Sequence, residues 1–377
     1  MKWTRRHWCT SMLAGATAAP WPARAAEAEI VVGQVGPFTV LPAPDAFQLN
    51  QGMRACFGQI NAEGGIGGRR VSLFELDDTY SADGFVKAFR TAMQRKPVAL
   101  LSPVGSVALK RMLDDKLLDQ AEVVVLNAIP GAESLRNPGH PRLFHIRAGD
   151  KQQIERVVRH VMTLGVHKLV VLHQNIVMGT SGLAVAQAGA AGKLEVVGLE
   201  ASTEAPSIQA AAQQAAQSDA KAVLMIGSPR FMADSIAQVR ALDKSKFVFA
   251  LSYAPASLVV KVAGGLARGV ALAQTFPNPQ GANSPLQQEF RAAMKRAQPT
   301  LAPMAYTSFH LEGYVTARVF AHAARRAGDS SAEGLAKALR AMGEYDLGGY
   351  RVNFARNNIG SNFVDIGVVN AEGTLNY

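Results

Sequence analysis

The first third of the chain alternates strand and helix signals in an order that strongly limits the possible fold. The segment from Gly33 to Ala108 begins with GQVGPFT, continues through a helical stretch ending in INAEGGIGGRRVSLFELDD, and closes with LLSPVGSVA. This order is strand, helix, Gly-rich turn, second strand, helix and third strand, and the third strand opens into a loop of small residues. It is typical of a parallel α/β sheet with a binding crevice at its carboxyl edge.

Short apolar runs continue the alternation to residue 251. Such runs suit strands that are covered on both faces of a parallel sheet. They occur at Ile30–Val35, Val71–Leu76, Val98–Leu101, Val123–Leu126, Leu169–Leu172, Val196–Leu199, Ala222–Ile226 and Phe247–Leu251. Helical stretches between and after them include Gln152–Leu164, Ile208–Ala216, Phe231–Ala241, Thr307–Ala327 and Ala332–Met342, and two short strands, Tyr350–Phe354 and Asp365–Val369, are predicted in the tail. The pattern predicts two domains, and we expect the chain to pass from the first domain to the second near Phe144–Gly149.

The first 25 residues have the form of an export signal. A basic start is followed by a short apolar run, Cys9–Ala19, and then by Ala23-Arg24-Ala25, which predicts cleavage before Ala26. The apolar run is too short to span a bilayer, which needs about 20 residues. The pair Arg5-Arg6 is compatible with the twin-arginine route as well as the general route, so the export route stays open. We expect a periplasmic protein that is not embedded in the membrane.

The charge balance argues against a nucleic-acid partner. The chain carries 39 basic and 29 acidic residues, a net charge of +10, and four of the basic residues lie in the signal, which leaves +6. No basic run is interleaved with aromatic residues. Cys56 is the only cysteine outside the signal and lies among apolar residues at helical spacing. We therefore expect no internal disulfide and a buried side chain rather than a reactive thiol.

Motifs of catalysis and metal binding are absent from the sequence. The eight histidines have no paired ligand spacing, and no G-x-S-x-G or HExxH motif occurs. The GGIGG run at Gly64–Gly68 precedes a strand, so a turn explains it better than a dinucleotide loop. Asp77 and Asp78 lie at a strand end without a second acidic cluster, which favours hydrogen bonding within the loop. We expect no enzyme activity, no cofactor and no metal.

Several motifs occur together in an order that resembles a known family. They are GPFT at Gly36–Thr39, INAEGGIGGRRV at Ile60–Val71 with the following Asp77–Asp78, SPVGS at Ser102–Ser106, SFHLEGY at Ser308–Tyr314, and Gly360–Ser361 before Phe363–Val369. With them the chain resembles the periplasmic substrate-binding proteins of branched-chain amino acid (Leu/Ile/Val) ABC importers. The resemblance implies a type I periplasmic binding fold, in which two doubly wound parallel-sheet lobes joined by three hinge crossovers close on a ligand like a Venus flytrap.

The resemblance also implies limits for the two lobes. The first would comprise residues 27–146 and 276–345, and the second residues 147–275 and 346–377. The crossings would fall near His145–Ala148, Gln274–Phe276 and Leu347–Tyr350.

Residues at the ends of the strands of the first lobe are candidate ligand contacts. Ser102, Gly105 and Ser106 follow the third strand, where hydroxyls and free N–H groups can bind a carboxylate. The resemblance places the ligand carboxylate there and at the next loop, Asn127-Ala128-Ile129. The alternative is that Ser102 and Ser106 only cap the following helix.

The second lobe departs from the pattern of the family. Tyr253 stands where amino-acid binders carry an acid for the ligand ammonium, and Met178 stands where an aromatic residue is usual. A buried ammonium without a carboxylate would be costly, so an organic acid, preferably aromatic, fits better than leucine. Phe38, Ser228 and Phe276 complete the candidate contacts. Packing at a strand end remains an alternative for Tyr253, and hinge packing remains one for Phe276.

The resemblance therefore implies a solute-binding protein of an ABC importer, with a small carboxylate-bearing solute and a membrane permease as its partners, and we expect a monomer. The alternative is a sensor of the same fold that passes its closed form to a membrane receptor.

Overall fold

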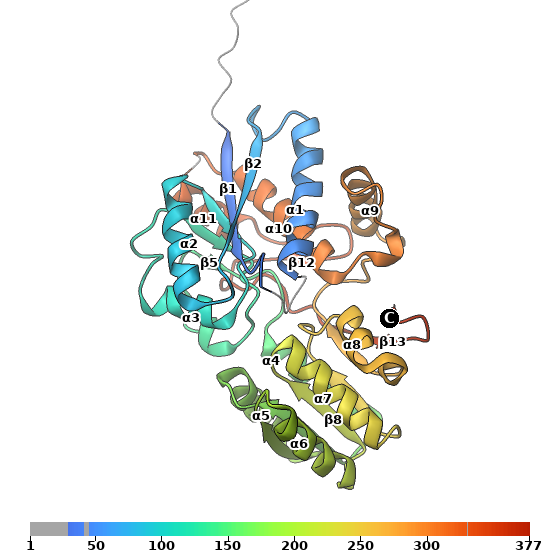
Figure 1. Ribbon diagram of the computed structural model, residues 1–377. Helices are drawn as coiled ribbons and strands as arrows, with labels where there is room; N and C mark the ends of the chain where they lie inside the picture. Colours follow the sequence, from blue (N-terminus) through green and yellow to red (C-terminus); the bar gives the residue numbers. More distant parts are fainter. Residues whose placement is uncertain (1–28, 41–44, 330) are drawn as a thin grey trace, which may run out of the picture.

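The computed structural model describes residues 29–40, 45–329 and 331–377, and these form two α/β lobes stacked one above the other (Figure 1). The first sheet has the order β2-β1-β3-β4-β5, and all its neighbouring strands are parallel. Its strands are β1 (Ile30–Gly36), β2 (Val71–Asp77), β3 (Ala99–Leu101), β4 (Val124–Leu126) and β5 (Leu143–Phe144). The helices of this lobe are α1 (Asp45–Ala62), α2 (Ala82–Gln94), α3 (Ser106–Asp114), α9 (Pro285–Ala297), α10 (Ser308–Ala324) and α11 (Ala332–Ala341).

Both faces of the first sheet are buried at its central strands, which explains why β3 and β4 are continuously apolar. Leu100 and Val125 belong to a core cluster with residues of α2 and α3. Their neighbours Leu101, Val124 and Leu126 belong to a second cluster with residues of α1 and α10. Because successive side chains of a strand point to opposite faces, each strand contributes to both clusters.

The second sheet has the order β14-β13-β10-β9-β8-β6-β7. Its strands are β6 (Lys168–Gln174), β7 (Glu195–Ala201), β8 (Ala222–Ile226), β9 (Phe247–Ala250), β10 (Ala271–Gln274), β13 (Asp365–Val369) and β14 (Leu375–Asn376). Its helices are α4 (Asp150–Thr163), α5 (Val177–Ala190), α6 (Ala205–Gln217), α7 (Pro229–Leu242) and α8 (Ala256–Ala263). The expectation of two parallel-sheet lobes is confirmed, and the second sheet has in addition an antiparallel edge, since β13 is antiparallel to β10 and β14 is antiparallel to β13.

The chain passes between the two sheets three times, after β5, after β10 and before β13. A hairpin of β11 (Tyr345–Asp346) and β12 (Arg351–Val352) precedes the last passage. His145 N–H donates to the Asn358 carbonyl at 2.8 Å, and Gly360 N–H donates to the His145 carbonyl at 2.7 Å. The tail therefore runs beside the first sheet as far as Gly360, although the resemblance implied a passage at Leu347–Tyr350.

The described residues also include three short 3₁₀ helices: η1 (Glu133–Leu135), η2 (Gly264–Ala267) and η3 (Pro303–Ala305). The predicted Gly-rich turn between α1 and β2 is present, and its four glycines all have positive φ values. Ile66 and Arg69 form a bridge across it. Strand β2 follows this turn, rather than the helix that a dinucleotide loop would require, as the sequence predicted.

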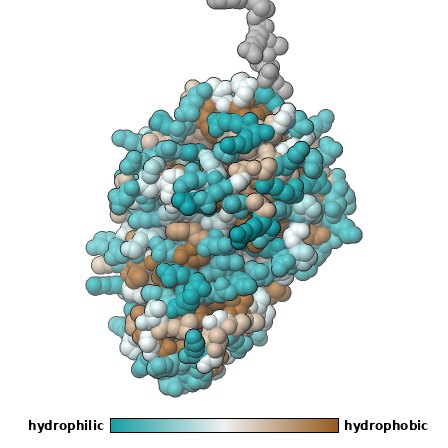
Figure 2. Space-filling view, turned by 180° about the vertical axis from the view of Figure 1, so that it is seen from behind, coloured by the Kyte–Doolittle hydropathy of each residue, from teal (hydrophilic) through white to brown (hydrophobic). Residues whose placement is uncertain are grey.

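The predicted export signal lies outside the described residues. Among the residues that the structure describes, no helix has the length and apolar character needed to cross a membrane. Seen from behind, the surface is mostly hydrophilic, with smaller hydrophobic patches between the polar side chains (Figure 2).

Cys56 on α1 is 1% exposed, which confirms the prediction of a buried side chain. Burial raises the pKa of its thiol to about 12. We expect residues 26–377 in the folded state to resist labelling by a thiol reagent at neutral pH, since the reactive thiolate is suppressed and the sulfur is covered. Labelling should become complete in denaturant. Mass spectrometry measures the labelling. Rapid labelling of the native protein would contradict the burial of Cys56.

Candidate ligand-binding cleft

Ser102 and Asn127 end β3 and β4 in left-handed backbone conformations, with φ values of 49° and 61°. Both side chains are fully buried and face α10. The Ser102 hydroxyl lies 3.4 Å from the Thr316 hydroxyl, and Asn127 Nδ2 donates to Thr316 Oγ1 at 2.9 Å. The structure thus brings these two candidates together through Thr316, and their contact with a ligand stays a prediction. Ala128 and Ile129 are buried on the two core clusters.

The start of α3 keeps its N–H groups free of a side-chain cap. Gly105 is the N-cap residue, with a φ of 104°, and no side chain accepts a hydrogen bond there. The alternative in which Ser102 or Ser106 caps this helix is therefore not observed. Uncapped N–H groups at a helix start favour an anionic ligand group.

Tyr80 lies at the same edge of the sheet and was missed by the sequence analysis. Thr79 and Tyr80 both have left-handed backbone conformations, with φ values of 49° and 52°. Asp78 Oδ1 accepts the Tyr80 N–H at 2.8 Å and so holds this turn. The Tyr80 ring passes over Gly105, where an added Cβ would lie 3.6 Å from it. Two consecutive strained residues at a strand end are a cost that functional sites often carry, and no local sequence signal predicts them.

Asp77 and Asp78 both accept hydrogen bonds from loop backbone N–H groups, in line with the role in loop hydrogen bonding that the sequence favours. Asp77 Oδ1 accepts the N–H groups of Phe38 and Thr39, at 2.7 and 3.0 Å. These bonds fix the GPFT loop. Asp78 is fully buried, and its Oδ2 has no partner among the described residues. Burial, with the charges of Asp77 and Asp45 nearby, raises the pKa of Asp78 to about 6.

This raised pKa predicts a stability that depends on pH. The folded protein holds the Asp78 proton up to about pH 6, whereas the unfolded chain releases it near pH 4. Stability is therefore lost as the pH rises from about 4 to 7. In Asp78→Asn the free energy of unfolding should fall less over this range than in the wild type, by up to about 3 kcal/mol. Urea unfolding at several pH values measures it, with the exposed Glu372→Gln as control. An equal fall in Asp78→Asn and wild type would contradict the expectation.

Exposed apolar side chains gather at the carboxyl edges of both sheets. On the first lobe they are Phe47 (50% exposed), Tyr80 (44%) and Val107 (68%). On the second lobe they are Ile176 (39%) and Val177 (61%), at the start of α5. We call these two sets the apolar lips. The rings of Phe38 and Phe47 meet edge to face at 5.4 Å, and Met178 is half-buried against the core.

Tyr253 follows β9 and is almost buried, at 8% exposed. Its hydroxyl donates to Asp150 Oδ1 at 2.5 Å. An added Cβ at Gly131 would lie 2.3 Å from both the Tyr253 hydroxyl and Asp150 Oδ1, so Gly131 of the first lobe packs directly against this pair. An acid therefore does lie beside Tyr253, but α4 supplies it rather than the strand end.

Charged groups meet beside Tyr253 where the chain first passes between the lobes. Arg147 Nη1 pairs with Glu312 Oε2 at 3.3 Å, and both side chains are 1% exposed. Arg136 Nη1 donates to the Arg147 carbonyl at 2.9 Å. Burial raises the pKa values of Glu312 and Asp150, and the two guanidinium groups oppose this rise. Two cations thus face two carboxyl groups.

The remaining candidates are Phe276, Ser228 and Met178. Phe276 is fully buried and stacks on Tyr350 at 4.8 Å, which supports its alternative role in hinge packing. Ser228 is the N-cap residue of α7, and its N–H donates to Gln174 Oε1 at 2.8 Å. Met178 and Ser228 both follow strands of the second sheet, on its carboxyl edge.

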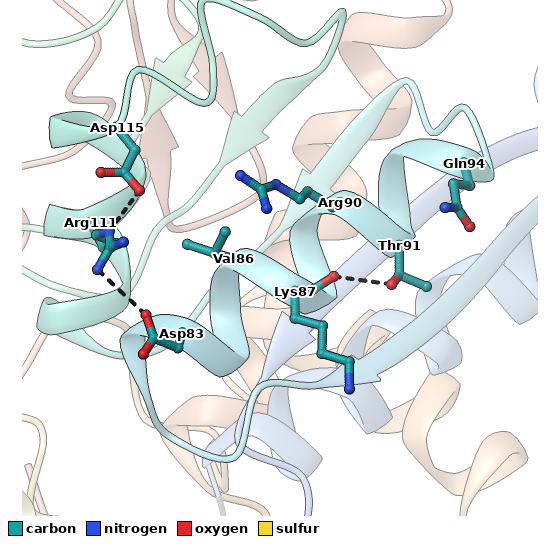
Figure 3. A pocket seen from close by; sticks show the side chains of 8 residues that line it. All are labelled: Asp83, Val86, Lys87, Arg90, Thr91, Gln94, Arg111 and Asp115. Carbon is teal, nitrogen blue, oxygen red and sulfur yellow. Dashed lines mark hydrogen bonds and ion pairs between the residues drawn. The ribbon is translucent and has the colours of Figure 1, made fainter.

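A pocket of about 430 Å³ lies elsewhere, on α2 and α3 (Figure 3). Arg111 of α3 pairs with Asp83 of α2 at 3.5 Å and with Asp115, at the end of its own helix, at 2.6 Å. None of the candidate residues lines it. Within the described ranges, no group of three His, Cys, Asp or Glu side chains is placed to hold a metal.

Comparisons with known proteins agree with this architecture. The model of a family described as periplasmic binding protein matches residues 29–372. The crystal structure of an extracellular ligand-binding receptor from Verminephrobacter eiseniae is 48% identical, has a TM-score of 0.89, and the match covers 93% of this chain and 100% of that one. A substrate-binding periplasmic protein from Ralstonia solanacearum is 28% identical, with a TM-score of 0.83 and coverage of 92% and 99%.

A more distant structure shows the fold alone. An ABC transporter substrate-binding protein from Desulfitobacterium hafniense, solved in complex with Leu, is 18% identical, with a TM-score of 0.77 and coverage of 93% and 99%. A comparison with curated proteins finds no significant match. The family match confirms the expectation of a binding protein rather than an enzyme. From its fold and from this match, the chain belongs to the periplasmic binding protein family.

Proposed function

We propose that this protein is the extracytoplasmic solute-binding component of an ABC importer. It binds a small carboxylate-bearing solute, an aromatic or other organic acid in preference to an amino acid, and closes its two lobes around it. The apolar lips carry this proposal. They stand exposed on both lobes at the sheet edges where doubly wound folds bind ligands.

The geometry also supports an anionic group on the solute. The first turn of α3 offers uncapped N–H groups beside the Tyr80 ring and the exposed Val107. A carboxylate bound there leaves the remainder of the solute between the apolar lips. The aromatic ring of Tyr80 then provides a flat, apolar contact for it.

The charges near Tyr253 argue against an ammonium group. Asp150 already accepts the Tyr253 hydroxyl, and the guanidinium groups of Arg136 and Arg147 lower its pKa against the effect of burial. Glu312 is paired with Arg147. Because these two carboxyl groups are balanced by two cations, a ligand ammonium at this place would add an uncompensated charge.

In this role the protein is a periplasmic monomer that delivers its solute to a membrane permease. A sensor of the same fold would use the same cleft. Uptake of the solute by cells with and without this protein separates the two functions, since only the importer component is needed for uptake.

A thermal-shift panel of residues 26–377 tests the solute class. Each aromatic or aliphatic acid is paired with its α-amino counterpart, for instance 3-phenylpropanoate with phenylalanine. A solute at 100 times its Kd stabilises by about 2.7 kcal/mol, which raises the Tm by a few degrees. We expect shifts with the acids. Shifts with leucine, isoleucine or valine alone would overturn the preference for organic acids, and no shift with any carboxylate would overturn the solute class.

Replacing Tyr80 by alanine should weaken binding of the acid with the largest shift about tenfold, or about 1.4 kcal/mol. The ring is exposed, so its loss should leave the fold intact. Phe247→Ala is the matched control, because Phe247 is similarly exposed (47%) but begins β9 at the opposite sheet edge. Isothermal titration measures both variants. Equal losses of affinity, or none in Tyr80→Ala, would contradict a contact between Tyr80 and the solute.

A further inference from the structure

Arg147 is a buried side chain that contacts both lobes at once. Its Nη1 pairs with Glu312 of α10 at 3.3 Å, and α10 packs on α1 over the first sheet. Its Nη2 donates to the Ser252 hydroxyl at 2.5 Å, directly after β9 of the second sheet. Its guanidinium carbon lies 4.9 Å from the centre of the Tyr253 ring, within the range of a cation–π contact.

The backbone of Arg147 is also fixed, through Asn127 at the end of β4. Asn127 Oδ1 accepts the Arg147 N–H at 3.3 Å, and Asn127 Nδ2 donates to Glu312 Oε1 at 3.0 Å. Arg147, Glu312 and Asn127 therefore form a closed ring of contacts. The ring joins the passage between the lobes to the end of β4, which carries three of the candidate ligand contacts.

Breaking the contact of Arg147 with Glu312 would separate two buried charges, and breaking its contact with Ser252 would leave a buried guanidinium N–H without its acceptor. Both losses are unfavourable in a buried place, and the loss of the ion pair is the greater. A lobe movement that keeps both contacts is therefore favoured over one that breaks them. This requires the lobes to turn about Arg147 rather than separate from it.

We propose that Arg147 is a positioning residue about which the lobes turn, and that it holds the Tyr253 ring in place on the wall of the solute cleft. This inference rests on the proposed closing function. It assigns the coupling between hinge and cleft to one side chain that the sequence analysis did not single out.

The test measures the lobes directly and needs no solute. Val107→Cys and Val177→Cys place spin labels on the two apolar lips, and the buried Cys56 stays unlabelled. In Arg147→Lys the charge remains, but an ammonium lacks the planar fork that reaches Glu312 and Ser252 together. We expect the distances between the two spin labels, measured by pulsed electron paramagnetic resonance, to be more broadly distributed in Arg147→Lys than in the protein without this substitution.

Arg318→Lys is the matched control. Arg318 pairs with Glu289 and lies over the Tyr314 ring at 5.8 Å, so all these partners belong to helices of the first lobe. We expect a lower Tm in this variant without a change in the distance distribution. Glu312→Gln, which removes the ion pair from the other side, should broaden the distribution as Arg147→Lys does.

An unchanged distribution in both Arg147→Lys and Glu312→Gln, with only a lower Tm, would overturn the inference and leave Arg147 a structural residue. A broadening in Arg318→Lys equal to that in Arg147→Lys would overturn it too. Because no solute enters the measurement, either result leaves the proposed solute class to be decided by the thermal-shift panel.

Discussion

Arg147→Met should destabilise the protein by about 3–5 kcal/mol, because it leaves the buried Glu312 carboxyl without its cation. Methionine fills a similar volume, so the effect comes from the charge rather than from a cavity. Urea unfolding of residues 26–377 measures it. The burial that raises the pKa of Glu312 then acts without the opposing charge of Arg147, so the loss should be smaller at acidic pH, where the carboxyl is protonated.

The double variant Arg147→Met, Glu312→Gln is the control for this prediction. It removes both charges, and its loss of stability should be clearly smaller than the sum of the two single losses. Additive losses would show that the two side chains do not interact. A loss below about 1 kcal/mol in Arg147→Met would contradict the picture of a buried, mutually dependent pair.

Gly52→Ala should be the most damaging small substitution in α1, since α1 and α10 approach each other there through glycine. An added Cβ at Gly52 would lie 2.0 Å from the His310 carbonyl oxygen, a backbone atom that cannot turn aside. At Gly313 of α10 it would lie 2.0 Å from the Leu49 carbonyl oxygen. The two helices must move apart, which costs about 1–3 kcal/mol or more in overpacked cores.

Gly58→Ala is the matched control on the same helix. An added Cβ there meets no atom within 4 Å, and alanine favours a helix over glycine by about 0.5–1 kcal/mol. The two substitutions should therefore change stability in opposite directions. The midpoints of urea unfolding measure both, and a Gly52→Ala protein as stable as the wild type would contradict the close helix contact.

The strands of this fold were predictable where both faces of a sheet are buried. Each of the eight runs up to residue 251 overlaps a strand. The central strands β3, β4 and β8 are continuously apolar, as suits a position between two helix layers, whereas the edge strands β2 and β7 are only partly buried. β5 has only two residues, and β10 reads Ala-Leu-Ala-Gln, so neither gave a run that stood out from its surroundings. The antiparallel edge formed by β13 was missed, since its pairing partner lies about 90 residues away in sequence.

The candidate cleft was predictable only in outline. The strand ends Ser102 and Asn127 follow from the rule that parallel strands share a carboxyl edge, and the structure places both there. Arg147 and Glu312 are 165 positions apart, so no local pattern could pair them. Tyr80 depends on two left-handed residues, which sequence propensities do not indicate at Thr or Tyr.

The claim that a solute closes the lobes is tested most directly by the distance between spin labels at Val107→Cys and Val177→Cys, measured with and without the acid that gives the largest thermal shift. Both side chains are exposed on the apolar lips in the structure described here. We expect a shorter distance when the acid is present at saturation, because the apolar lips meet around it. The same distance with and without a saturating acid would contradict binding by closure of this cleft.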